Sequence, residues 1–236
     1  MAEDISPALL SKVQKNFRSK LEKAGATKPE MLKRVRDGTI YSINQYTHKV
    51  GKSLAYAFLE ELTPEALPNE TLYYNIARKV MLPPIEEAHD MISDVADELQ
   101  AIKYRQMGLG LKPIRPPIQM DRFDGIINLL TEGTFVDSIH YLNEPIRNLV
   151  DHFGDYHVEK NAEFMSGSGV DFSITRVGER TACDWCAERE GSYSSYSEAQ
   201  ANDVFARHEG CRCELIIKGR GSSGKMRARG NAFVRS

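Results

Sequence analysis

The four cysteines restrict this chain more than any other feature of its sequence, because all of them lie between positions 183 and 213. Cys183 and Cys186 form a Cys-x-x-Cys pair, and residues 208–213 are His-Glu-Gly-Cys-Arg-Cys. Two residues between cysteines let the backbone turn so that both sulfurs face one ion, and thiolate and imidazole are preferred ligands of Zn²⁺. The sequence therefore predicts a tetrahedral zinc site with four ligands from Cys183, Cys186, His208, Cys211 and Cys213. Cys183 and Cys186 are expected to bind with two of the other three, and the sequence leaves open which two.

We expect this zinc to be structural. Four protein ligands close the coordination sphere, whereas a catalytic zinc keeps one position open. Cys183 lacks the preceding proline of the zinc deaminases, and the His-Glu-x-x-His of the zincins is absent. The alternatives are buried free thiols, or a redox pair at Cys183 and Cys186. A redox pair belongs at the start of a helix in a βαβ unit, which the surrounding sequence does not predict.

The residues before position 166 show helical periodicity, with apolar side chains recurring every three or four positions. The expected helices cover residues 6–24, 41–62, 85–106 and 135–164. Each apolar stripe leaves a polar face, which is typical of helices packed around a shared core. We expect the Pro83-Pro84 pair to separate two helices, and Pro145 to kink or restart the last one.

The pattern changes after residues 166–169, a Ser-Gly-Ser-Gly stretch that is typical of a linker. Short strands are expected over 171–176 and 214–218, and a helix over 197–207 with Ser197 as its N-cap. This secondary structure is too little to bury a core of its own, so zinc is expected to hold the segment together. The predicted fold class is mainly α, with a helical N-terminal domain (1–166), a small α+β Cys/His zinc module (167–218) and a basic flexible tail (219–236).

The charge pattern limits the partners. The net charge is −2, no apolar run approaches the roughly 18 residues that a membrane span needs, and the first residues lack the features of a signal peptide. We therefore expect a protein kept in a reducing cytoplasm, with no membrane and no small-molecule substrate. The basic residues of the end segment have no acidic neighbour; they are Lys218, Arg220, Lys225, Arg227, Arg229 and Arg235. Such a segment either follows DNA phosphates or is simply solvated.

No catalytic residues are predicted. The histidines outside the cysteine cluster are expected to be surface or capped residues, and the acidic residues to lie on solvated helix faces. A nuclease using His208 would need a second histidine or an Asp-His pair nearby, and neither is evident. The chain is therefore not expected to be an enzyme.

Residues 174–218 resemble the phage minor head proteins, the family related to the head-morphogenesis protein of phage Mu. The resemblance rests on the lead-in 176–181, the pair Cys183-Asp184-Trp185-Cys186, the turn Glu190-Gly191 and the ending His208-Glu209-Gly210-Cys211-Arg212-Cys213. The family usually has proline where this chain has Glu209. The similarity covers about a fifth of the chain, and the helical part carries no motif of the family.

The resemblance implies a structural component of the virion head, located in the host cytoplasm during assembly. It implies association with the portal or the major capsid protein, and contact with packaged double-stranded DNA would suit the basic segment. One alternative is a cellular zinc-module protein that binds nucleic acid, although the module's own charges are mixed. The other is a zinc-containing nuclease.

Overall fold

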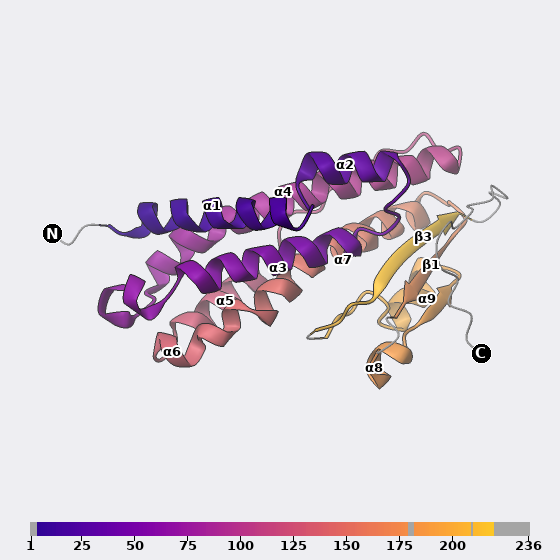
Figure 1. The fold of residues 1–236 in the computed structure, drawn as a ribbon. Coiled ribbons are helices and arrows are strands. Elements are labelled where there is room, and N and C mark those ends of the chain that lie inside the picture. The colour runs from indigo at the N-terminus through magenta and orange to yellow at the C-terminus, as the bar shows by residue number, and fades with distance from the viewer. Residues whose placement is uncertain (1–3, 179–181, 209, 220–236) are drawn as a thin grey trace, which may run out of the picture.

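The computed structural model describes residues 4–178, 182–208 and 210–219. It shows an elongated layer of helices with a small sheet packed at one end (Figure 1). The predicted class, mainly α with a small α+β part near the C-terminus, is confirmed. None of the helices in the described ranges has the length and apolarity that a membrane span requires.

The first three helices are α1 (Ser6–Lys23), α2 (Lys28–Arg36) and α3 (Asn44–Glu61). The predictions for α1 and α3 are confirmed to within three residues. The sequence analysis missed α2, which begins after Thr27 with Pro29 in its first turn. Buried positions every three to four residues, such as Val13, Phe17 and Leu21, turn α1 toward α3 and α4.

The fourth helix corrects the prediction for the proline pair. After two short 3₁₀ turns (η1, Pro64–Ala66; η2, Pro68–Glu70), α4 runs from Tyr74 to Gln106 with Pro83 and Pro84 inside it. A proline removes one backbone hydrogen bond and crowds the preceding turn. Here the apolar stripe continues from Val80 to Ile85 with both side chains fully buried. The burial of apolar side chains before and after the two prolines offsets the free-energy cost of the lost hydrogen bonds, and the helix continues.

The chain then forms α5 (Met120–Thr131), α6 (Phe135–Ser138), the 3₁₀ turn η3 (Ile139–Leu142) and α7 (Glu144–Gly167). The single helix expected over 135–164 is therefore three elements. Pro145 lies in the first turn of α7, so it restarts the helix, one of the two outcomes expected for it. The sequence analysis did not predict α5.

Helices α3 and α7 are in tight contact at two glycines. A Cβ at Gly154 of α7 would lie 2.7 Å from Thr47 Cγ2 and 3.1 Å from Ile43 Cγ2. A Cβ at Gly51 of α3 would lie 3.3 Å from the Arg147 backbone. These two helices pack with α4 around one continuous apolar core.

Three antiparallel strands follow, in the order β2-β1-β3: β1 (Phe172–Val177), β2 (Gly191–Tyr193) and β3 (Glu214–Gly219). The two predicted strands are confirmed to within one residue, whereas β2 was not expected. Side chains on one face of β1 and β3 are buried and belong to the same core as the helices; they are Phe172, Ile174, Leu215 and Ile217. The sheet therefore buries its apolar face against the helices.

Two short helices complete the C-terminal part, α8 (Asp184–Ala187) and α9 (Tyr196–Ala201). The helix expected over 197–207 is shorter and starts earlier. Its cap is Ser195, whose hydroxyl accepts a hydrogen bond from the Glu198 N–H at 3.1 Å, rather than Ser197. The helix ends because Asp203, two residues after its last residue, takes a left-handed conformation (φ 51°).

Candidate metal centre

The first half of the site is built on α8. Cys183 precedes this single helical turn and Cys186 lies within it, so both side chains project from the same side. The Ala187 N–H donates to the Cys183 carbonyl at 2.9 Å and closes the turn. Cys183 is exposed and Cys186 is buried.

The second half lies in the connection between α9 and β3. The Cys211 N–H donates to the His208 carbonyl at 3.2 Å, and Gly210 has a φ of +72° that favours glycine. Cys213 directly precedes β3, and both Cys211 and Cys213 are buried. This turn brings a histidine and two thiols to α8.

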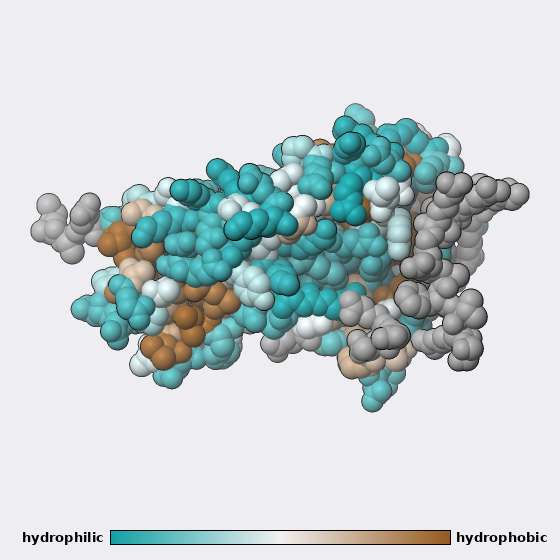
Figure 2. Space-filling model, viewed as in Figure 1, coloured by the Kyte–Doolittle hydropathy of each residue, from teal (hydrophilic) through white to brown (hydrophobic). Residues whose placement is uncertain are grey.

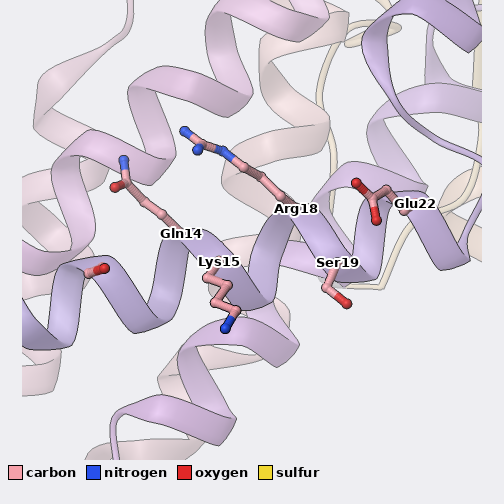
Figure 3. A pocket seen from close by; sticks show the side chains of 6 residues that line it. Gln14, Lys15, Arg18, Ser19 and Glu22 are labelled. Carbon is pink, nitrogen blue, oxygen red and sulfur yellow. The ribbon is translucent and has the colours of Figure 1, made fainter.

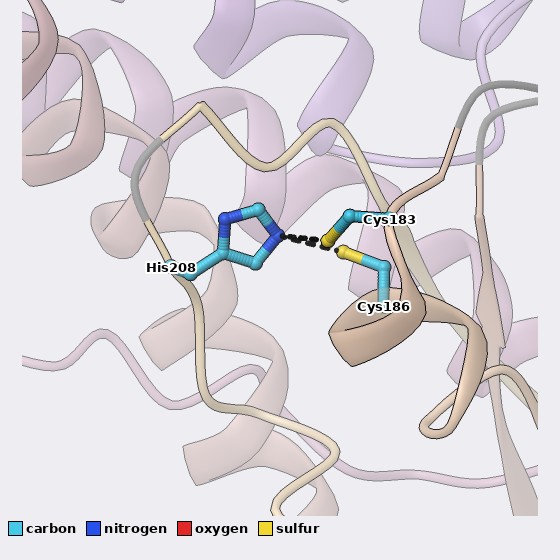
Figure 4. Close-up of side chains that lie close together, drawn as sticks. All are labelled: Cys183, Cys186 and His208. Carbon is cyan, nitrogen blue, oxygen red and sulfur yellow. Dashed lines mark hydrogen bonds between the residues drawn. The ribbon is translucent and has the colours of Figure 1, made fainter.

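The donor atoms of the two halves meet (Figure 4). His208 Nε2 lies 3.3 Å from Cys183 Sγ and 2.9 Å from Cys186 Sγ, and Cys186 Sγ lies 3.6 Å from Cys211 Sγ. Zinc bond lengths in a tetrahedral site place a sulfur and a nitrogen ligand about 3.5 Å apart, and two sulfurs about 3.8 Å apart. These three separations are close to those of a loaded site.

All five predicted residues belong to the cluster. Their donor atoms form two overlapping groups with mutual distances within 4.8 Å, Cys183–Cys186–His208 and Cys186–Cys211–Cys213. Cys186 is common to both. The structure thus shows a Cys/His cluster that could hold a metal ion, under a small pocket that the same residues line.

A buried arginine on β1 supports the cluster. Arg176 is 2% exposed, and its Nη1 donates to the carbonyls of Val204 and Ala206 at 2.6 and 2.7 Å. Its Nη2 donates to Cys211 Sγ at 3.4 Å. A hydrogen bond from the Cys213 thiol, together with the charges of Arg207 and Arg176, lowers the pKa of Cys211. The same bond and burial raise the pKa of Cys213. A thiolate at Cys211 suits metal ligation.

Trp185, the single tryptophan of the chain, lies between the two cysteines of α8. The guanidinium of Arg189 lies 3.9 Å from its ring centroid, and that of Arg176 lies 5.2 Å away. The His208 ring meets the indole edge to face at 5.0 Å. Trp185 therefore covers one side of the cluster, and its fluorescence can report on metal binding.

Arg207 connects the cluster to the helices, and the sequence analysis missed it. Its Nη1 donates to the Cys211 carbonyl at 2.8 Å, and its Nη2 to the Cys213 carbonyl at 3.1 Å. The guanidinium also makes a two-pronged contact with the Asp155 carboxylate of α7, at 2.5 and 2.9 Å. Asp155 is 2% exposed, so the expectation that acidic residues lie on solvated faces is wrong here. The only sequence signal was a basic residue next to His208.

The predicted histidine environments also need correction. His157 and His89 are buried: His157 Nε2 lies 2.8 Å from Asp97 Oδ1, and His89 Nε2 lies 3.2 Å from the Pro116 carbonyl. They pack in the helical interior because hydrogen-bond partners satisfy their ring nitrogens. Neither belongs to a metal-competent group within residues 4–178, 182–208 and 210–219.

Of the basic residues predicted to contact nucleic acid, only one lies in the part of the chain that the structure describes. Lys218 is exposed on β3. The others lie outside the described residues; they are Arg220, Lys225, Arg227, Arg229 and Arg235.

A shallow hollow along α1 is lined by Lys15, Arg18 and other polar residues of that single helix (Figure 3). Its side chains do not converge, and Arg18 pairs with Glu87, so the hollow is not a candidate site.

Comparison with known proteins finds no matching family model, no matching curated protein and no matching solved structure.

Proposed function

We propose that the cluster binds one structural Zn²⁺ through Cys183, Cys186, His208 and Cys211. The proposal rests on the group Cys183–Cys186–His208, whose donor atoms all lie within 4.8 Å of one another, and on the 3.6 Å between Cys186 Sγ and Cys211 Sγ, which makes Cys211 the fourth donor. Cys213 is then the spare thiol and donates a hydrogen bond to the ligating sulfur. The metal would fasten α8 to the segment that enters β3.

Metal analysis tests this proposal directly. Protein purified without chelators is expected to contain about one zinc per chain. Loading with Co²⁺ should give the strong visible absorption and thiolate charge-transfer bands of a tetrahedral site, because cobalt reports ligand type and geometry. A folded protein with no bound metal would contradict the proposal.

We further propose that the protein is a non-enzymatic component of a phage head, acting with the portal or the major capsid protein. The supporting observation is the Cys-x-x-Cys…His-x-x-Cys-Arg-Cys pattern, whose members form two overlapping donor groups. Four protein ligands on one ion would leave no coordination position for a substrate. This pattern is the one that resembles the minor head proteins.

The helical end far from the cluster is the proposed contact with the head. Apolar surface gathers around α5 and α6 there (Figure 2). Leu129 is 42% exposed, and Val136 is 60% exposed. Exposed apolar side chains of this kind can form the buried centre of an interface.

The matched test uses two exposed valines in full-length protein. Wild type is expected to co-sediment with heads assembled from the cognate portal and shell proteins. Val136→Lys should weaken co-sedimentation, whereas Val177→Lys, at a 39% exposed site on β1, should not. The reverse pattern would place the contact on the sheet. Failure of the wild type to join any head would remove the phage assignment and favour the alternative, a cellular nucleic-acid-binding protein.

A further inference from the structure

A buried polar network joins the cluster to the helices. Asp155 Oδ1 accepts from Arg207 at 2.9 Å and from Asn44 Nδ2 of α3 at 2.6 Å. Asn44 Oδ1 in turn accepts from the Leu215 N–H of β3 at 2.8 Å. Asn44 is fully buried, and the side chains of Asp155 and Arg207 are 3% and 8% exposed. The network therefore spans α3, α7, the ligand segment and β3 with almost no contact with water.

The network fixes the backbone that presents the metal ligands. Arg207 precedes His208, and its guanidinium holds the carbonyls of Cys211 and Cys213. Arg207 can hold both carbonyls in place only while its own position is fixed, and the carboxylate of Asp155 fixes it. A buried arginine without this carboxylate would carry an unpaired charge and would be drawn toward water.

We propose that metal binding and the packing of the sheet against the helices are thermodynamically coupled through Asp155, which is a positioning residue for the metal ligands. This inference rests on the proposed zinc site. A bound metal orders the ligand segment with Arg207 facing α7, and the pair with Asp155 orders the same segment before the metal arrives. Coupling between two events is reciprocal, so each must strengthen the other by the same factor.

The first experiment measures zinc affinity in full-length protein by competition with a chromophoric chelator, with Trp185 fluorescence as a second signal. Asp155→Asn keeps the shape of the side chain and removes the charge. We expect affinity to fall about 10- to 100-fold, the range for partners that orient metal ligands. Asp97→Asn is the matched control. Asp97 lies on α4 and pairs with His157, which is on α7 like Asp155, but the hydrogen-bond partners of Asp97 are His157 and Arg115 rather than the ligand segment. The affinity of this variant should stay within about twofold of wild type.

The reciprocal experiment removes zinc from the wild type and follows amide hydrogen exchange. The Leu215 N–H should exchange at least about tenfold faster without metal, because its acceptor Asn44 belongs to the network. Amides in the middle of α4 should keep their rates. Arg207→Lys provides a second variant if Asp155→Asn does not fold, since lysine keeps the charge but cannot hold the carboxylate and both carbonyls together. It should weaken zinc binding over the same range.

The outcomes separate the two proposals. Zinc bound equally by wild type and by Asp155→Asn would overturn the coupling and leave the metal site intact. Equal weakening by Asp155→Asn and Asp97→Asn would also overturn it, since the effect would then be general destabilisation. Wild type without zinc affinity would refute the metal site itself, and the coupling with it.

Discussion

Replacement of Gly154 by alanine tests the close packing of α3 on α7. In an exposed helix interior, alanine is more favourable than glycine by about 1 kcal/mol. At position 154, however, the new methyl group would lie 2.7 Å from Thr47 Cγ2 and 3.1 Å from Ile43 Cγ2, and both side chains are buried. Overpacking of a core typically costs about 1–3 kcal/mol. We therefore expect a net destabilisation of about 1 kcal/mol.

Gly125→Ala is the matched control, because Gly125 lies inside α5, is exposed, and has no neighbour within 4 Å of the position that a methyl group would take there. The same substitution should stabilise the protein there by about 0.5–1 kcal/mol. Urea unfolding followed by circular dichroism measures both free energies of unfolding, and the m-value should not change. Stabilisation by Gly154→Ala, or a change of the same sign and size in both variants, would refute the packing argument.

Three further predictions concern the metal, pH and DNA. Cys186→Ser should abolish zinc binding because Cys186 belongs to both donor groups, whereas Cys213→Ser should keep about one zinc per chain by elemental analysis; a metal-free Cys213→Ser protein would make Cys213 a ligand. Burial and the charge of Arg122 lower the pKa of His152 from 6.5 to about 4. As the pH falls, the unfolded chain therefore binds a proton at a higher pH than the folded protein does. The free energy of unfolding should fall by on the order of 3 kcal/mol between pH 6.5 and pH 4, and by less in His152→Gln. Equal pH profiles of the two proteins in urea titrations would contradict this. Deletion of residues 220–236 should abolish a weak DNA affinity whose log–log salt slope is up to roughly −5 in the full chain, and unchanged binding would show that the segment takes no part.

The sequence by itself determined the elements whose signals are local. Helical periodicity located α1 and α3, and the apolar runs located β1 and β3. The spacing of Cys183 and Cys186, and of His208 and the two later cysteines, identified the donors of the cluster, because one turn of the backbone can bring donors a few residues apart to the same ion. The elements that the sequence analysis did not predict, such as α2 and β2, are short and carry little periodic signal.

Only the tertiary structure decided the features that depend on distant partners. The proline pair of α4 looks like a helix break in sequence, and the burial of Val80 and Ile85 against other helices makes the helix continue. Asp155 is an acidic residue in a helix of mixed polarity, and nothing local marks it as buried. Its partner Arg207 lies 52 positions away, and a buried charge is stable only where such a partner arrives in space. Local sequence sets the donor groups of the cluster, whereas three-dimensional packing sets how the cluster is joined to the helices.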